Sequence, residues 1–394
     1  MAQYDNKFSQ TARIKVIGIG GGGCNAVNRM VQESVQGVEF IIANTDAQVL
    51  AASPVSNKII LGEQVSKGLG AGANPEIGRQ AAIESEPSIK DHLKDSDLIF
   101  IAAGMGGGTG TGAAPEIARI AQETGALVVA IVTKPFRFEG RMRNSYAIQG
   151  VAELKKHVDS LIVISNDRLL EIIGNIPIQD SFKEADNVLK QGVQTITDLI
   201  AVPALVNLDF ADVRTVLKGR GNALFGIGIG SGPDKAIEAA NKAITSSLLE
   251  TSIRGAKSAI VNVTGGLNMS LNDAHDAVDI IEQAAGDELN VIFGAAVNEH
   301  LNDELIVTVI ATGFDDAVVD DDYQPEQSIQ YEEPNNTEPE YSYSSRRMQP
   351  QQPSRYDNQN DNNEMKVVKP TANVQEQQDD DDDGDFPTFL RKTW

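Results

Sequence analysis

A glycine-rich run at residues 104–112, Gly-Met-Gly-Gly-Gly-Thr-Gly-Thr-Gly, constrains the fold more than any other stretch of this sequence. It follows an apolar run that predicts a buried strand and precedes a run that predicts a helix. Glycine lets backbone N–H groups approach an anion closely, and a helix start adds free N–H groups and a positive dipole end. A flexible surface loop is the alternative, but such a loop is not expected between two strongly apolar elements. The run therefore predicts a phosphate-binding loop, with contacts from Gly104, Gly107, Gly108, Thr109, Gly110 and Thr111, the two threonines adding hydroxyl donors for phosphate or a metal-bound water.

Buried strands alternate with helices along the first half of the chain. Apolar runs predict strands at 14–19, 40–43, 59–61, 98–103, 127–133 and 161–164. Helices are predicted at about 26–32, 75–93, 113–120 and 138–158. This alternation specifies an α/β fold with a mostly parallel sheet, in which ligands bind at the carboxyl ends of the strands, where the glycine runs lie.

A second glycine run, followed by Cys24 and Asn25, lies between the first predicted strand and its helix. Gly18, Gly20 and Gly23 satisfy the G-x-G-x-x-G pattern, and Asp46 follows the second strand, about where a ribose-binding acid is expected. Taken alone, this arrangement favours a nicotinamide-dependent oxidoreductase. The pattern has low specificity, because four consecutive glycines satisfy many motifs.

The second half predicts a smaller α/β domain, joined to the first by a long helix over 179–201 whose apolar residues recur at helical spacing. After a loop at 207–213, strands are predicted at 223–229, 259–263, 291–297 and 305–312, with helices at 234–249 and 271–285. The predicted parts are a disordered N-terminus (1–12), a nucleotide-binding domain (13–178), a central helix (179–202), a C-terminal domain with a mixed sheet (203–314), a disordered linker (315–378) and a terminal peptide (379–394).

The nucleotide cannot be held by a P-loop lysine, because the chain lacks the G-x-x-x-x-G-K-[ST] motif. Backbone amides, helix dipoles and a metal ion must hold it instead. Phe182 and Asp186 lie four residues apart on one face of the long helix. A carboxylate beside a ring suits guanine, whose N1–H and N2–H are both donors, and Asn166 at a strand end is placed to reach the same base. A solvated helix residue is the alternative for Asp186.

Two further groups of polar residues carry binding hypotheses. Glu139 and Arg143 suit a ribose hydroxyl and a phosphate or base edge, with an ion pair between them as the alternative. Asn207, Asp209 and Asp212 follow the long helix, on the order of 30 Å from its base-binding end. They therefore cannot serve the nucleotide of their own subunit. They can serve a neighbour's nucleotide if copies stack head to tail, a contact that produces open filaments.

Charge and composition exclude several classes of protein. The formal net charge is −23, which argues against a nucleic-acid partner. The single cysteine rules out an intrachain disulfide and indicates a reducing compartment. The sequence shows no secretion signal, no apolar run long enough to span a membrane, and four scattered histidines without metal-ligand spacing. A soluble cytoplasmic protein is expected.

The last eighty residues differ from the rest of the chain. From Asp315 onward there are 20 Asp and Glu against 7 Lys and Arg, and aliphatic residues are scarce before the final cluster. Such a segment buries too little apolar surface to offset its chain entropy, so disorder is expected. The cluster Asp385–Trp394 combines acidic, apolar and basic residues and predicts a partner-docking peptide; a solubilising tail is the alternative.

The residues also resemble a known family. The run at 106–112 is similar to the tubulin signature loop, and Gly20–Gly23, Asn44-Thr45-Asp46, Asn207–Asp212 and Asp385–Arg391 extend the likeness. From about Thr11 to Phe314 the chain resembles the tubulin/FtsZ family. This resemblance implies a tubulin-like fold: an N-terminal Rossmann-like GTPase domain, a long central helix, a smaller C-terminal α/β domain and a disordered tail.

The resemblance implies a GTPase that polymerises head to tail into protofilaments at the midcell division site and recruits division proteins and membrane anchors through Asp385–Arg391. GTP or GDP and Mg²⁺ are the implied cofactors. Implied phosphate, ribose and base contacts are Gly20, Gly21, Gly22, Gly23, Cys24, Asn25, Asn44, Asp46, Gly108, Thr109, Gly110, Glu139, Arg143, Asn166, Phe182 and Asp186. Asn207, Asp209 and Asp212 are implied to orient and polarise the attacking water in the next subunit's site.

Some residues depart from the family pattern. Cys24 stands where asparagine is usual, which leaves the backbone contacts of that loop in place but not a side-chain contact. Phe386 replaces the usual isoleucine of the terminal peptide, and Thr393-Trp394 extend its end. Besides the oxidoreductase, a non-catalytic scaffold that acts through its tail is a further alternative.

Overall fold

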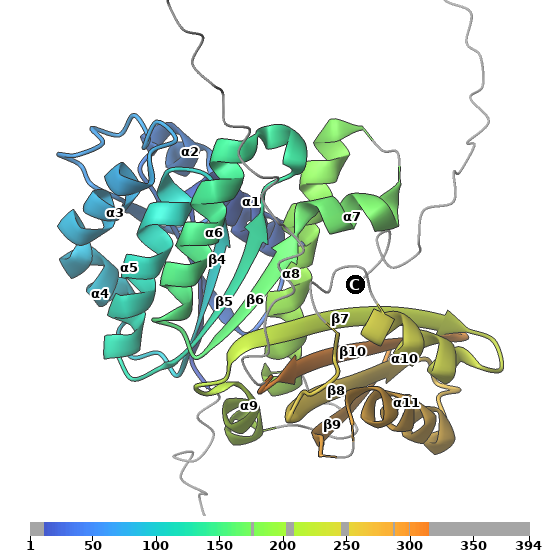
Figure 1. Ribbon diagram of the computed structural model, residues 1–394. Helices are drawn as coiled ribbons and strands as arrows, with labels where there is room; N and C mark the ends of the chain where they lie inside the picture. The colour runs from blue at the N-terminus through green and yellow to red at the C-terminus, as the bar shows by residue number, and fades with distance from the viewer. Residues whose placement is uncertain are drawn as a thin grey trace, which may run out of the picture. The chain divides into compact units, whose positions relative to one another are not determined.

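A ten-stranded sheet organises the computed structural model of the chain, with the strand order β3-β2-β1-β4-β5-β6-β7-β10-β8-β9 (Figure 1). Strands β1 to β6 are parallel, β7 continues parallel to β6, and β10 runs antiparallel to both β7 and β8. The predicted α/β fold with a mostly parallel sheet is confirmed. The structure describes residues 12–174, 177–201, 209–245, 252–286, 288–298 and 300–314.

The strands and helices alternate through most of the described chain. The strands are β1 Ile14–Ile19, β2 Val38–Asn44, β3 Asn57–Ile60, β4 Leu98–Gly104, β5 Leu127–Lys134, β6 Ser160–Ser165, β7 Gly221–Ser231, β8 Ser258–Gly265, β9 Asn290–Val297 and β10 Glu304–Thr312. The helices are α1 Gly20–Gln32, α2 Ala47–Ala52, α3 Pro75–Glu84, α4 Glu86–Leu93, α5 Thr109–Glu123, α6 Arg141–Lys155, α7 Asn166–Ile173, α8 Ile178–Ala201, α9 Phe210–Leu217, α10 Lys235–Thr245 and α11 Leu271–Ala285.

Helices cover both faces of the parallel strands. Val16 of β1 faces a core that includes residues of α1 and α8, whereas Ile17 faces a second core that includes residues of α3, α4, α5 and α6 (Figure 1). A strand that is covered on both faces needs an unbroken apolar sequence. Strands β4 and β5 have such sequences and are buried along almost their whole length. In this half of the chain, the loops that connect strands to helices therefore lie at the ends of the strands.

The long helix α8 follows the predicted span closely. Its buried apolar side chains recur every three or four residues and join the core on the α1 side of the sheet; they are Ala185, Val188, Leu189, Val193, Ile196 and Leu199. With 24 residues, α8 is about 36 Å long. The residues near its start and those that follow its end therefore serve opposite edges of the parallel sheet.

The second half of the chain continues the same sheet. Strand β7 pairs with β6 over only three residue pairs, beginning with Ser160 opposite Gly221. The Ser160 hydroxyl donates to the carbonyl of Leu217 at the end of α9 (2.6 Å), and Gly219 N donates to a carboxylate oxygen of Asp159 (3.1 Å). Helices α10 and α11 pack with β8 and β10 around a third core. The halves therefore meet at the amino-terminal end of β6.

Two predicted helix starts were wrong by several residues. Helix α1 begins at Gly20, although the sequence predicts its start near residue 26, and α5 begins at Thr109, although the sequence predicts residue 113. Glycine is a poor helix former, so propensity alone places the glycine runs outside the helices. Tertiary packing overrides that preference here, because only glycine permits the close backbone contacts made at both starts.

Other predicted elements also needed correction. The helix predicted over 75–93 is two helices, α3 and α4, which meet at Ser85, two residues before Pro87. The Ser85 hydroxyl accepts a hydrogen bond from Gly62 N (2.9 Å) at this break. The strand end at residues 165–167 and the loop at 207–213 contain the first residues of α7 and α9, which apolar periodicity did not reveal because each helix has only eight residues.

The glycines of α5 provide a test of this packing. A Cβ added at Gly112 would lie 1.8 Å from the carbonyl oxygen of Pro75, a backbone atom that cannot move aside. We expect Gly112→Ala to lower the free energy of unfolding by about 1–3 kcal/mol or more, as overpacking does. The control is Gly22→Ala, whose Cβ would lie 3.5 Å from Gly104 in ordinary contact. Equal denaturation midpoints for the two variants would contradict the assigned packing.

Candidate functional site

Two helix N-termini meet at the carboxyl ends of β1 and β4. These strands are adjacent and in register, with Ile19 opposite Ala103, and α1 starts directly after β1. A Cβ added at Gly20 would lie 2.8 Å from the backbone nitrogen of Gly110 in α5. A Cβ added at Gly110 would lie 2.4 Å from the carbonyl oxygen of Gly104. The first turns of α1 and α5 are therefore in direct backbone contact.

Neither helix start is neutralised by the protein. Helix α1 has Ile19 as its N-cap and α5 has Gly108, and neither residue makes a side-chain capping bond. Neither first turn contains an acidic residue. Free N–H groups and two positive dipole ends thus converge on one point, which is the arrangement that binds phosphate.

The glycines of this site fall into two groups. Gly108 and Gly110 are enclosed by backbone of neighbouring elements, so their lack of a side chain serves packing. Gly21 and Gly107 are different, since an added Cβ at either would meet nothing within 4 Å. Neither of these two has a positive φ, so conformation does not require glycine there. Open space beside a glycine at two helix starts indicates room for a ligand.

The two signature threonines have different environments. The Thr109 and Thr45 hydroxyl oxygens lie 2.7 Å apart, which ties the β2–α2 junction to the start of α5. Thr111 is 4% exposed, and its Oγ1 accepts a hydrogen bond from Gly106 N (2.8 Å). Accepting from Gly106 N leaves the O–H of Thr111 able to donate, so the expectation that Thr111 offers its hydroxyl to phosphate stays a prediction. Through this hydrogen bond Thr111 also fixes the shape of the signature loop.

The residues around the β2 end are placed by hydrogen bonds within the protein. Asn44 is 3% exposed and accepts from Asp46 N through Oδ1 (3.3 Å). Asp46 is the N-cap of α2 and accepts from Gln48 N (2.9 Å), so one of its oxygens is already engaged. Cys24 is fully buried, and burial raises the pKa of its thiol to about 12. The Cys24 side chain therefore belongs to the core and contributes no ligand contact.

An aromatic cluster marks the other end of the candidate site. Phe136 is buried, and its ring stacks on Phe138 with centroids 5.0 Å apart and an interplanar angle of 13°. The ring of Phe182 from α8 lies edge-on to Phe136 at 5.2 Å and is 43% exposed. An exposed ring held by two neighbours is a ready stacking surface for a planar base.

Asn166 and Asp186 are polar side chains whose hydrogen-bonding capacity is not fully used within the protein. Asn166, the first residue of α7, is 5% exposed, and within the described residues its Oδ1 is the one buried side-chain N or O atom that has no hydrogen-bond partner. Burial raises the pKa of the Asp186 carboxyl to about 7, and the positive charge of Arg29 opposes part of this rise. A buried acceptor without a partner is costly, so both groups suit a ligand that brings donors.

Glu139 and Arg143 form an ion pair with each other. The Glu139 carboxylate also accepts from Phe136 N (2.9 Å), which fixes the turn before α6. The interpretation of these residues as an ion pair therefore describes this structure. The start of α6 still reaches the signature loop, since a Cβ added at Gly106 would lie 2.8 Å from the carbonyl oxygen of Arg143.

The acidic residues expected to act on water lie elsewhere. Asp209 is the N-cap of α9 and accepts from Asp212 N (2.8 Å), while Asp212 accepts from Asp209 N (3.4 Å). The far end of α9 bonds to β6 at its amino-terminal end, opposite the strand ends that carry the glycine loops. Asn207 lies outside the described residues. The structure thus separates Asp209 and Asp212 from the two helix starts.

Comparison with known proteins identifies the family. Residues 13–174 match the GTPase domain of the Tubulin/FtsZ family, and residues 221–315 match the C-terminal domain of the FtsZ family. The structure of an empty FtsZ dimer from M. jannaschii is 41% identical, with a TM-score of 0.74 and coverage of 77% of this chain and 89% of that chain. This chain belongs to the FtsZ family. It is a GTPase, because it carries the GTPase domain of that family.

More distant structures share the FtsZ-family fold. CetZ2 from Haloferax volcanii, described as a GTPgS-bound protofilament, is 19% identical with a TM-score of 0.66, covering 77% of this chain and 94% of that chain. CetZ1 from the same organism, a GDP-bound monomer, is 20% identical with the same TM-score, covering 78% and 96%. The alternative of a nicotinamide-dependent oxidoreductase finds no support in these comparisons.

Two further findings concern the described residues. They contain no group of three or more His, Cys, Asp or Glu side chains arranged to hold a metal ion. None of their helices combines the length and apolar character that a membrane span requires.

Two contacts around the site were not predicted from the sequence. The Thr45 hydroxyl lies beside that of Thr109. The Arg29 side chain donates to Asn187 on α8 (2.9 Å). Each contact joins residues that are distant in the chain, so spacing along the sequence does not reveal it.

The two open glycines of this FtsZ-family site provide a direct test. We expect Gly21→Ala and Gly107→Ala each to weaken GTP binding by at least about tenfold, or ~1.4 kcal/mol, because the new methyl group occupies space that the phosphates require. Both variants should unfold at the wild-type temperature, since the methyl group meets no protein atom. Calorimetric titration measures the affinity; unchanged GTP binding in both variants would place the nucleotide elsewhere.

Proposed function

We propose that this chain polymerises head to tail into protofilaments and hydrolyses GTP at the junction between two subunits. The observation that carries this proposal is the separation of Asp209 and Asp212 from the paired helix starts. The helix starts lie at the carboxyl ends of the parallel strands, whereas α9 is anchored at the amino-terminal end of β6. Two partial sites at opposite sheet edges become one complete site when copies stack in a single direction.

Each partial site lacks what the other supplies. The first turns of α1 and α5 contain no carboxylate, so the phosphate end has no acid there to polarise water. Asp209 is exposed, and the capping box of α9 engages one oxygen of Asp209 and one of Asp212. The carboxylates of Asp209 and Asp212 accept a proton from, or orient, a water molecule that lies against the phosphate of the neighbouring subunit. Asn207 is proposed to join them.

Exposed apolar residues support contact surfaces on both halves of the chain. Leu69 is 83% exposed in the loop before α3, and this loop runs close to the start of α5, since a Cβ added at Gly108 would lie 2.8 Å from Ala71 Cβ and 2.9 Å from Asn74 N. Leu267 and Leu271 are 77% and 85% exposed near the start of α11. We assign these exposed leucines to the surfaces that subunits bury against each other, where apolar side chains leave water.

The nucleotide site itself is proposed to select guanine. Phe182 stacks on the base, Asp186 accepts from N1–H and N2–H, and Asn166 donates to or accepts from the same edge. The backbone of Gly21–Asn25 and Gly108–Gly110 binds phosphate, and Glu139 and Arg143 exchange their mutual pair for contacts with the ribose and base. Mg²⁺, if bound beside the phosphates, would neutralise part of their charge.

In the cell, we propose that the filaments form the division ring at midcell on the cytoplasmic side. Membership of the FtsZ family supports this role. The terminal peptide Asp385–Arg391, which lies outside the described residues, is proposed to recruit division proteins and membrane anchors. Its acidic, apolar and basic composition supports docking on proteins more than a solubilising role.

The shared site predicts complementation between inactive variants. Asp209→Ala should bind GTP normally but nearly lose turnover, and Gly107→Ala should bind GTP weakly and also lose most of its turnover. An equimolar mixture should regain about a quarter of the wild-type rate, because random stacking joins an intact phosphate site to an intact acid at one junction in four. Phosphate release measures the rate.

The control mixture combines Asp209→Ala with Asp212→Ala, whose defects lie in the same partial site. It should stay inactive, because no junction then holds both acids. Recovery in neither mixture would argue against a shared site, and wild-type turnover by Asp209→Ala alone would remove that residue from the mechanism.

The pKa of Asp186 predicts how acid affects GTP binding. Only the ionised carboxylate accepts two N–H groups, and burial raises its pKa to about 7. Between about pH 8 and about pH 6 the affinity should therefore fall by about tenfold through this group. The effect on folding has the opposite sign: the empty protein should lose stability as pH rises from about 4 to about 7, because the folded state holds this proton more tightly than the unfolded chain.

Asp186→Asn is the matched control for this pH dependence. The phosphates of GTP titrate in the same range, so the difference in slope between wild type and Asp186→Asn isolates the carboxylate. We expect the variant to bind GTP more weakly at about pH 8 and to show a shallower decrease on acidification. Parallel pH profiles for the two proteins would mean that Asp186 does not contact the base.

A further inference from the structure

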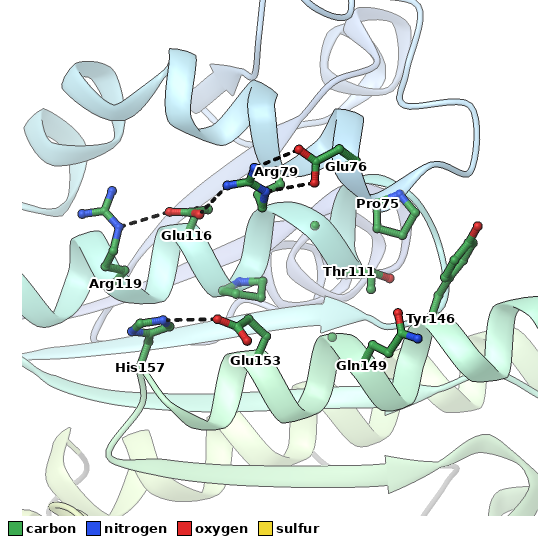
Figure 2. Close-up of a pocket in the computed structure, with 13 residues that line it drawn as sticks. Pro75, Glu76, Arg79, Thr111, Glu116, Arg119, Tyr146, Gln149, Glu153 and His157 are labelled. Carbon is green, nitrogen blue, oxygen red and sulfur yellow. Dashed lines mark hydrogen bonds and ion pairs between the residues drawn. The ribbon is translucent and has the colours of Figure 1, made fainter.

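A groove of about 350 Å³ lies on the outer face of the helix layer, between α6 on one side and α3 and α5 on the other (Figure 2). Its floor includes Thr111 and Gly112 of α5 and Gly150 of α6. Thr111 is the residue whose hydroxyl accepts from Gly106 N inside the signature loop. The groove is therefore separate from the nucleotide site but shares one residue with the loop that forms it.

The two ends of the groove differ in character. Pro75 and Tyr146 lie toward one end, and Glu153 and His157 lie toward the other, with Glu116 on the facing helix α5 (Figure 2). Three of these lining residues, Tyr146, Gln149 and Glu153, follow one another along α6 at intervals of three or four residues, so their side chains form one row that His157 continues just past the helix end. The groove thus has an apolar, aromatic end and a charged end, where Glu116 and Glu153 lie with Arg119.

The charges of the groove leave Glu153 as its most available carboxylate. Arg79 donates to both oxygens of Glu76 (3.0 and 2.8 Å), and Arg119 donates to Glu116 (3.1 Å), which pairs these groups within the α3–α5 wall. Glu153 is 52% exposed, faces His157 at 3.9 Å and is otherwise held by the surface residue Lys156. It also stands in the last turn of α6, where the helix dipole favours a cation. This end of the groove suits a positively charged group.

We propose that the groove binds the C-terminal segment Phe389–Lys392 of the same chain. Phe389 fills the end lined by Pro75 and Tyr146, and Arg391 and Lys392 replace the weak surface pair at Glu153. The lengths agree. Tyr146 and Glu153 are seven residues apart on a helix, or about 10 Å, and an extended segment covers about 10 Å between Phe389 and Lys392.

The chain between the described residues and this segment is long enough to reach the groove. Seventy-four residues separate Phe314 from Phe389. A flexible chain of that length has a root-mean-square span of about 45–50 Å. The acidic character of this connection does not oppose docking, because the basic residues of the segment come after it.

Docking in the groove has two consequences for the segment and the loop. A segment held by the groove is withheld from other proteins, so the groove stores the terminal peptide between contacts with partners. It also covers Thr111, and thereby brings the peptide against the back of the signature loop. Both consequences follow from binding alone and do not depend on GTP hydrolysis.

The single tryptophan, Trp394, reports this contact in the unmodified full-length chain. It lies two residues after Lys392, so docking restricts its motion. Without nucleotide, we expect the fluorescence anisotropy of Trp394 to be at least about twofold lower in Glu153→Lys than in the wild type, and unchanged in the control Asp276→Lys, an exposed carboxylate on α11. Dilution should leave the wild-type value unchanged, because the contact is within one chain.

Reversing the charges on both sides of the proposed contact distinguishes loss of the contact from damage to the fold. Combining Glu153→Lys with Arg391→Glu and Lys392→Glu should restore the wild-type anisotropy, whereas Arg391→Glu with Lys392→Glu alone should lower it. A photo-crosslinking residue at position 389 should attach to α6 or α3 of its own chain when isotopically light and heavy proteins are mixed. Equal anisotropy in all variants, cross-links to other surfaces, or cross-links between light and heavy chains would each overturn the proposal.

Discussion

The backbone contact between the starts of α1 and α5 is the constraint on which the rest of the site depends. Gly20 and Gly110 touch through atoms that every residue has, so any side chain at Gly20 would force the helices apart. Because β1 and β4 are adjacent and in register, they deliver both helix starts to the same level of the sheet. Strand pairing thus brings the two helix starts together, and the glycines permit their close approach.

The same sheet also explains why the remaining parts of the site lie where they do. Helix α8 crosses the α1 face, where Lys190 pairs with Glu33 and Arg29 donates to Asn187. These contacts fix α8 beside α1, and Asp186 lies near enough to Arg29 of α1 for that positive charge to lower the pKa of its carboxyl. The whole of α8 is about 36 Å long, and the chain leaves it at the opposite edge. A helix of this length separates Phe182 and Asp186 near its start from the acids that follow its end.

The sequence predicted the strands well and the helix starts poorly, for physical reasons. A strand buried on both faces must be apolar throughout, so β4 and β5 are visible as runs of Leu, Ile, Val, Phe and Ala. Glycine at a helix start carries no such signal, because its use at Gly20 and Thr109–Gly110 depends on packing between distant segments. The orientation of Thr111 was hidden for the same reason: its partner, Gly106 N, is set by the loop and not by spacing.

The first turns of α1 and α5 contain no acidic residue, and the acids Asp209 and Asp212 are placed on another helix, α9. A carboxylate in those first turns would repel phosphate and cancel the helix dipoles, so the anion site and a water-polarising acid are incompatible as neighbours on these turns. Asp209 and Asp212 are instead held in a capping box of α9, where each stabilises the helix through one oxygen. The acids are therefore positioned before any neighbour arrives. In the proposed head-to-tail stacking, these acids would reach the phosphate site from the neighbouring subunit, so one subunit would bind the nucleotide and the next would supply the carboxylates.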